Sequence, residues 1–198
     1  DSGCRLAVVV PDKTVENTYG CECVVDFIRS LGHRDCTVQR DGEPAWVALI
    51  NNAVTECGKI GIVAEPRDAP RYSHAGLGAV DRAQQTIQKQ IRSLRTDVQN
   101  RYCIWLSTDR PAWPWLVRLA AWLLDRFAVK RNGHTPYEDA YGTAYRGPVL
   151  QFIECCLFRR TKSDTGAMTR GRRYQKADNM WDQGLWLGKA HISNEHII

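Results

Sequence analysis

Two aspartates, Asp41 and Asp81, stand where carboxylates could do chemistry. Asp41 follows the predicted strand 36–40 and precedes Gly42, so it lies where that strand ends. Ligand and metal sites in open α/β sheets gather at this edge, although Asp-Gly is also a common turn sequence. Asp81 lies in the first turn of a predicted long helix, where the helix dipole alone favours a carboxylate. For each aspartate, a metal-ligating role and a purely structural role both stay open.

A polar stripe continues from Asp81 along the same predicted helix. Steps of four and three residues place side chains on one helix face, and here they join Asp81, Gln85, Gln88, Arg92 and Arg95, with Lys89 beside them. A carboxylate followed by amides and cations suits a phosphodiester backbone. We therefore predict DNA contacts at Gln85, Gln88, Lys89 and Arg92, the alternative being an ordinary solvated helix face.

A second candidate for nucleic-acid binding is the polar segment 159–176. It contains seven basic residues and one acid, in a chain with a net charge of +5. Such a segment favours a polyanionic partner, or it is a solvated basic loop. From it we predict DNA contacts at Arg170, Arg172 and Arg173.

Composition excludes several classes of protein. The 198 residues are 43% hydrophobic and 25% charged, which is typical of a globular chain rather than a disordered one. No apolar run reaches the roughly 18 residues that a membrane-spanning helix needs, so we expect no membrane partner. Eight cysteines are too few for a disulfide scaffold and fit no usual zinc spacing, which favours a reducing, intracellular compartment. The seven tryptophans lie mostly at core-like positions, which does not indicate a base-stacking platform.

Hydrophobic periodicity predicts the elements that must position these residues. Strands are expected at 4–11, 36–40, 60–64, 149–158, 184–188 and 196–198, and helices at 18–31, 44–56, 79–100, 112–128 and 135–141. A loop is expected at 65–78. The alternation predicts an α/β domain over 1–142, followed by a small β-rich extension over 143–198 that carries the basic loop 159–176.

Several segments resemble, in order and spacing, the catalytic core of retroviral-type integrases, in particular those of copia-type retrotransposon polyproteins. They are 38–45 (VQRDGEPA), 78–83 (GAVDRA), 90–95 (QIRSLR), 113–127 (WPWLVRLAAWLLDRF), 133–138 (GHTPYE) and 181–188 (WDQGLWLG). The resemblance covers nearly the whole chain. Each motif is loose, and the specificity lies in their order and spacing.

The resemblance implies a ribonuclease H-like mixed sheet flanked by helices, with its first strand missing, and a DNA-integrating polynucleotidyl transferase. In that family three carboxylates hold two Mg²⁺ or Mn²⁺ ions for phosphodiester cleavage and strand transfer. Asp41 matches the second acid and Asp81 the third, where the family has Glu. The first acid would lie upstream of Asp1, so the two-metal site is expected only when that residue is present. Nuclear location during integration is likewise implied.

The helix expected at 112–128 is apolar nearly all round, so it is either buried or half-covered by another subunit. Similar integrase cores dimerise through this helix, which implies a homodimer here. Some of six large apolar side chains are then expected to be exposed in one chain, namely Trp113, Trp115, Leu116, Leu119, Trp122 and Leu123. Two other hypotheses remain beside the active transferase: a catalytically inactive DNA-binding or assembly module of the same fold, and an unrelated intracellular α/β domain.

Overall fold

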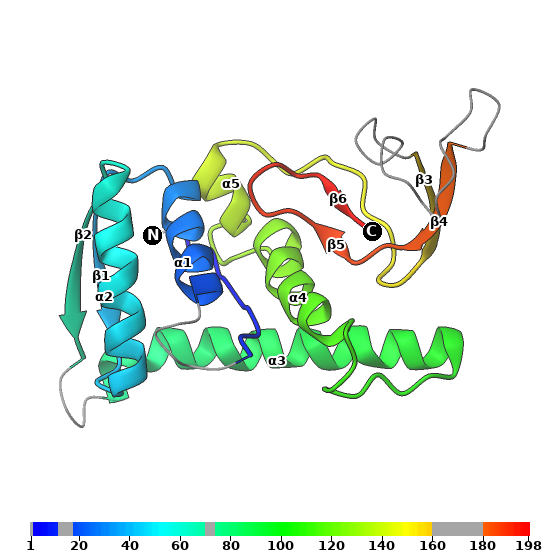
Figure 1. Cartoon of the computed structure of the whole chain (residues 1–198), viewed down its shortest axis with the longest axis horizontal. Helices are drawn as coiled ribbons and strands as arrows, with labels where there is room; N and C mark the ends of the chain where they lie inside the picture. Colours follow the sequence, from blue (N-terminus) through cyan, green and yellow to red (C-terminus); the bar gives the residue numbers. More distant parts are fainter. Residues whose placement is uncertain (1, 12–17, 70–73, 160–179) are drawn as a thin grey trace, which may run out of the picture.

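A computed structural model describes residues 2–11, 18–69, 74–159 and 180–198 of the chain. The architecture is α/β (Figure 1). Its helices are α1 (Thr18–Ser30), α2 (Pro44–Lys59), α3 (His74–Tyr102), α4 (Trp113–Phe127) and α5 (Pro136–Tyr141). Its strands are β1 (Asp35–Arg40), β2 (Val63–Asp68), β3 (Cys155–Arg159), β4 (Trp181–Leu185), β5 (Gly188–Lys189) and β6 (His196–Ile197).

The first layer is built from α1, β1, α2 and β2. Strands β1 and β2 are parallel, with Asp35 opposite Val63 and Arg40 opposite Asp68. Helix α2 makes the crossover between them, as parallel pairing requires. A small core of Cys57, Ile62 and Ala64, with half-buried residues of α1 and β1 packed against it, holds the helices on one face of the sheet.

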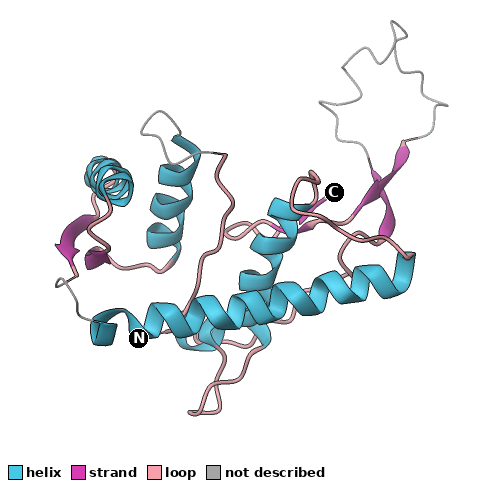
Figure 2. Cartoon of the chain, turned by 90° about the horizontal axis from the view of Figure 1, so that it is seen from below, coloured by secondary structure: helices cyan, strands magenta, loops and turns pink. Residues whose placement is uncertain are grey.

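The main core lies between α3, α4 and the C-terminal segments. Helix α3 runs along almost the whole length of the molecule, and α4 packs across it (Figures 1 and 2). The buried members of this core come from distant parts of the chain and are Val98, Leu106, Leu116, Leu119, Trp122, Phe152 and Trp186. Strand pairs β3–β4 and β5–β6 are antiparallel. Residues beyond 143 therefore share a core with the preceding helices.

All five predicted helices are confirmed, with shifts at some ends. Helix α3 begins at His74, so much of the segment expected to be a loop is β2 or helix. Strand β2 begins at Val63 rather than residue 60, because Ile60 caps α2 and Gly61 takes a left-handed φ of 79°. A left-handed residue cannot continue a strand, so pairing begins only after it.

The strand expected at 4–11 is wrong. Residues 4–10 run through the structure without pairing to any described strand, and residues 6–10 form no backbone hydrogen bond to any described residue. Their side chains are mostly half-buried beside a hollow of about 470 Å³ that α1 and α2 also line. The hydrophobic pattern therefore predicted an apolar segment correctly, but it could not show that this segment has no strand to pair with among the described residues. For the described residues, the expected mixed sheet is replaced by three two-stranded sheets.

The expected exposure of α4 is also wrong. Leu116, Leu119 and Trp122 are buried, and the other three predicted side chains are half-buried, so none of the six is exposed. Trp186, Phe152 and α3 cover the face that the sequence left without a partner. Among the described residues, no helix combines the length and the apolar composition needed to cross a membrane.

Candidate nucleic-acid interface

The predicted polar stripe lies on the solvent face of α3. Gln85, Gln88, Lys89 and Arg92 are all exposed, as is Asp81 nearer the start of the helix. On the opposite face, Ile91, Leu94 and Val98 pack into the main core. These are the two faces of one amphipathic helix, and burying the apolar face against α4 fixes the polar face outward.

Lys89 and Arg92, the exposed cations of this stripe, have no carboxylate partner among the described residues. The Arg92 Nε donates to the Gln88 carbonyl at 3.2 Å, which holds the side chain along the helix. Within the described part of the chain, neither Lys89 nor Arg92 forms an ion pair with a carboxylate. An anion brought to this face would therefore meet two cations that need not first break a salt bridge.

Asp41 lies at the end of β1, as predicted, and its carboxylate is exposed. The neighbouring Arg40 fixes the strand end, because its guanidinium donates to Asp68 at 2.6 Å and to the Asn51 side chain at 2.6 Å. Asp81 is the eighth residue of α3, so the prediction that it lies in the first turn of this helix is wrong. The carboxyl ends of β1 and β2 and the first turns of α3 lie at the same end of the molecule (Figure 1).

The carboxylates at this end are the type of ligand that a hard divalent cation prefers, but Asp41 and Asp81 are too few to hold two ions. Mg²⁺ takes oxygen ligands and is commonly held by one or two carboxylates together with substrate phosphates. No group of three or more His, Cys, Asp or Glu residues able to hold a metal occurs in the described part of the chain. Asp41 and Asp81 remain predicted ligands, and a third acid would have to come from elsewhere.

The second predicted contact region falls outside the described residues. Strand β3 ends at Arg159, and Arg170, Arg172 and Arg173 lie beyond it in the segment 160–179. The predicted contacts of these arginines with DNA stay predictions.

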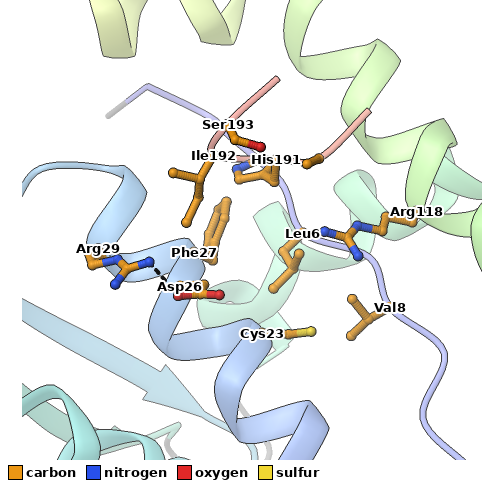
Figure 3. A pocket seen from close by; sticks show the side chains of 11 residues that line it. Leu6, Val8, Cys23, Asp26, Phe27, Arg29, Arg118, His191, Ile192 and Ser193 are labelled. Carbon is orange, nitrogen blue, oxygen red and sulfur yellow. Dashed lines mark ion pairs between the residues drawn. The ribbon is translucent and has the colours of Figure 1, made fainter. Parts of the chain in front are cut away.

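A second hollow, of about 220 Å³, lies between α1, residues 6–8, α4 and residues 190–193. Figure 3 shows Arg118 and His191 reaching into it from separate elements above the α1 side chains. Burial, and then the nearby cations Arg126 and Arg118, lower the pKa of His191 to about 4. The imidazole is therefore neutral at pH 7, and its ring lies 5.8 Å from that of Phe27.

A buried carboxylate lies close to the same elements. Asp125 in α4 is 2% exposed, and it accepts two hydrogen bonds from the Arg5 backbone N–H, at 2.9 and 3.1 Å. Burial outweighs these bonds and the neighbouring arginines, so the pKa of Asp125 rises to about 6. Sequence reasoning missed both Asp125 and His191. The only signal was an acid inside an apolar helix, and nothing in the sequence pointed to the histidine.

Comparison with known proteins gives likenesses to solved structures but no family by sequence. No protein-family model matches this chain, and no curated protein matches it. Among the solved structures that match is the crystal structure of the catalytic core domain of BIV integrase in crystal form I. It is 22% identical, covers 72% of this chain and 80% of its own, and superimposes with a TM-score of 0.49. A likeness with this identity and TM-score assigns no activity to the chain.

Proposed function

We propose that this chain binds DNA along the exposed face of α3, as the core of an integrase-type polynucleotidyl transferase. The observation that carries the proposal is the row Gln85, Gln88, Lys89 and Arg92, exposed together on one helix, with neither cation paired to a carboxylate of the described residues. We expect these amides and cations to contact phosphate and sugar, so binding should be indifferent to sequence. The order of integrase-like motifs in the sequence supports the same assignment.

The proposed chemistry is two-metal phosphodiester cleavage and strand transfer. Asp41 and Asp81, together with the acid expected upstream, would hold two Mg²⁺ or Mn²⁺ ions. One ion would supply activation of water or a DNA 3′-hydroxyl, and the other would supply stabilisation of the leaving oxygen. Asp81 reaches one methylene less far than the Glu of the family, which displaces its carboxylate by about 1 Å and costs much of the rate. With two acids rather than three, these 198 residues alone should show no strand transfer.

A restored site tests this chemistry. An added upstream strand with its aspartate, combined with Asp81→Glu, should give Mg²⁺-dependent cleavage or joining. Asp41→Asn in that protein should abolish the activity and leave DNA binding intact. Unchanged activity in the Asp41→Asn protein would make Asp41 a turn residue. Failure of the restored protein to react at all would favour the second candidate, an inactive DNA-binding or assembly module of the same fold.

Three further properties belong to the proposal because the sequence resemblance implies them. They are an origin in a retrotransposon polyprotein, nuclear location during integration, and a homodimer through helix 112–128. Such a dimer contact would centre on the end of that helix, where Phe127 is 50% exposed, since three of the six side chains expected to form it are buried and the other three are half-buried. Sedimentation of Phe127→Ser beside the parent chain tests this contact, and an unchanged dimer would exclude it.

The salt dependence of DNA binding tests the interface. For a duplex, the logarithm of the binding constant falls with the logarithm of salt concentration with a slope of about 0.9 per phosphate neutralised. The double change Lys89→Ala with Arg92→Ala should lower that slope by about 1.8. A matched control removes two exposed charges elsewhere that have no carboxylate partner among the described residues, by Arg34→Ala with Arg131→Ala. Equal slopes for the two double variants, or no binding by the parent chain at low salt, would contradict the proposal.

A further inference from the structure

Trp105 is an exposed aromatic side chain next to the polar stripe. Trp105 lies in the segment that follows α3, and 59% of the residue is exposed. The guanidinium carbon of Arg95, in α3, lies 3.6 Å from the centre of the indole ring. One face of the indole is therefore covered by a cation, and the exposed area belongs to the rest of the ring.

Packing against the main core holds the Arg95–Trp105 pair in place. The Arg95 guanidinium carbon is also 5.4 Å from the Trp113 ring, and the Arg95 Nε is buried with no hydrogen-bond partner in the described part of the chain. Next in sequence, Leu106 is buried in the main core and fixes the backbone at Trp105. The indole is thus a rigid, outward-facing surface.

The surface is continuous with the proposed DNA interface. Arg95 is three residues beyond Arg92 on α3, a rise of about 4.5 Å, so the arginine that stacks on the indole is a neighbour of Arg92 on the helix surface. Proteins that bind single-stranded nucleic acid combine a cationic track for the phosphates with aromatic rings on which bases stack. Lys89 and Arg92 would supply the track, and Trp105 the ring.

We propose that Trp105 stacks an unpaired base of a DNA strand whose phosphates contact Lys89 and Arg92. The inference rests on the proposed function and names the form of DNA that the site prefers: a single-stranded segment rather than an intact duplex, whose bases are already stacked on each other. The neighbouring Ile104 is also exposed, so an apolar protein surface is the competing occupant.

Trp46 provides a matched control. It is 44% exposed at the start of α2, beside an apolar hollow, and no cation of the described residues stacks on its ring. If exposure alone drew a base to a tryptophan, changing Trp46 would weaken single-strand binding as much as changing Trp105.

The test compares fluorescence anisotropy for an oligothymidylate strand, an abasic strand of the same length, and a duplex, all at one salt concentration. Trp105→Ala should lower affinity for the oligothymidylate by about 5- to 150-fold, the range measured for removal of one stacking ring. It should leave duplex affinity and abasic-strand affinity unchanged, and Trp105→Phe should retain most of the preference. Trp46→Ala should have no effect.

Each outcome separates the two proposals. Normal duplex binding with an unchanged oligothymidylate affinity in Trp105→Ala would overturn the stacking inference and leave the α3 interface standing, and it would direct attention to a protein partner. An equal loss on all three DNAs would also overturn it. No binding of any DNA by the parent chain would overturn the interface itself. If urea unfolding shows that Trp105→Ala does not fold, Trp105→Phe provides the test. Oligothymidylate should then quench tryptophan fluorescence more strongly in the parent chain than in Trp105→Phe. Equal quenching in the two proteins would overturn the stacking inference.

Discussion

Two buried groups should give the stability of this protein opposing pH dependences. Burial raises the pKa of Asp125 from 3.8 to about 6, so the fold prefers its protonated form. Stability from that group is present below pH 3.8 and is lost as pH rises through about 6. Burial lowers the pKa of His191 from 6.5 to about 4, so the fold prefers the neutral imidazole. Stability from that group is present above pH 6.5 and is lost as pH falls through about 4.

The two effects are similar in size. One pKa unit corresponds to about 1.4 kcal/mol, so each group should change the free energy of unfolding by about 3 kcal/mol across its window. Partial exposure of His191 reduces its share to about 2 kcal/mol, because solvent screens the nearby cations. The windows overlap and the signs oppose, so the two contributions should nearly cancel in the parent chain between pH 4 and 6.5.

Single substitutions should expose each half of this balance. Relative to the parent, Asp125→Asn should become more stable as pH rises from 4 to 6.5, by about 3 kcal/mol in total. His191→Gln should become less stable over the same range, by about 2 kcal/mol. Urea unfolding in half-unit pH steps measures both, and taking differences from the parent removes the contribution of the exposed carboxylates that all three proteins share.

The slopes of these difference curves decide the matter. Constant offsets are expected, since Asp125→Asn weakens the bonds to the Arg5 N–H and His191→Gln removes the ring packed beside Phe27. A difference curve for Asp125→Asn that is flat with pH would show that this carboxyl is ionised in the fold at pH 4 to 6. A positive slope for His191→Gln would show that the imidazole gains rather than loses protons on folding. Either result would refute the reasoning.

Other changes test local structure and the interface. Gly188→Ala should lower the free energy of unfolding by about 1–3 kcal/mol, because Gly188 has a φ of 141°, whereas Gly42→Ala, where an added Cβ meets nothing within 4 Å, should cost less. Equal urea midpoints for these two variants would contradict this. Thr135→Ala should cost about 1 kcal/mol by removing the capping box of α5, measurable as a lower melting temperature. Asp41→Asn should leave the DNA affinity of these 198 residues unchanged or slightly higher, since it removes only an anion; a large loss in a binding titration would place Asp41 within the contact.

The sequence predicted the helices because each carries its own periodicity. The apolar positions 83, 87, 91, 94 and 98 of α3 lie on one face whatever the rest of the chain does, so the outward stripe could be predicted with them. The segment 4–11 was different. Its composition favours a strand, but a strand exists only by hydrogen bonding to another, and no local pattern reveals whether that partner is present.

The burial of α4 and the exposure of Trp105 could not be predicted from local sequence either, because both depend on contacts with distant parts of the chain. Phe152 and Trp186 lie 25 or more residues beyond the end of α4 and cover it, so a helix that is apolar nearly all round did not have a free face. Trp105 lies in an irregular segment whose direction depends on Leu106 entering the core. The perturbed Asp125 and His191 depend on burial by several elements at once, which no spacing in the sequence encodes.

The central claim is that DNA lies along α3, and crosslinking from a defined position tests it most directly. A photoreactive phenylalanine at Gln88 lies in the middle of the exposed stripe, and the same residue at Lys59 lies at the far end of α2. With labelled DNA at low salt, we predict crosslinks from position 88, their loss at high salt, and none from position 59. Crosslinks from position 59 at equal yield, or none from position 88 while DNA is bound, would contradict the account.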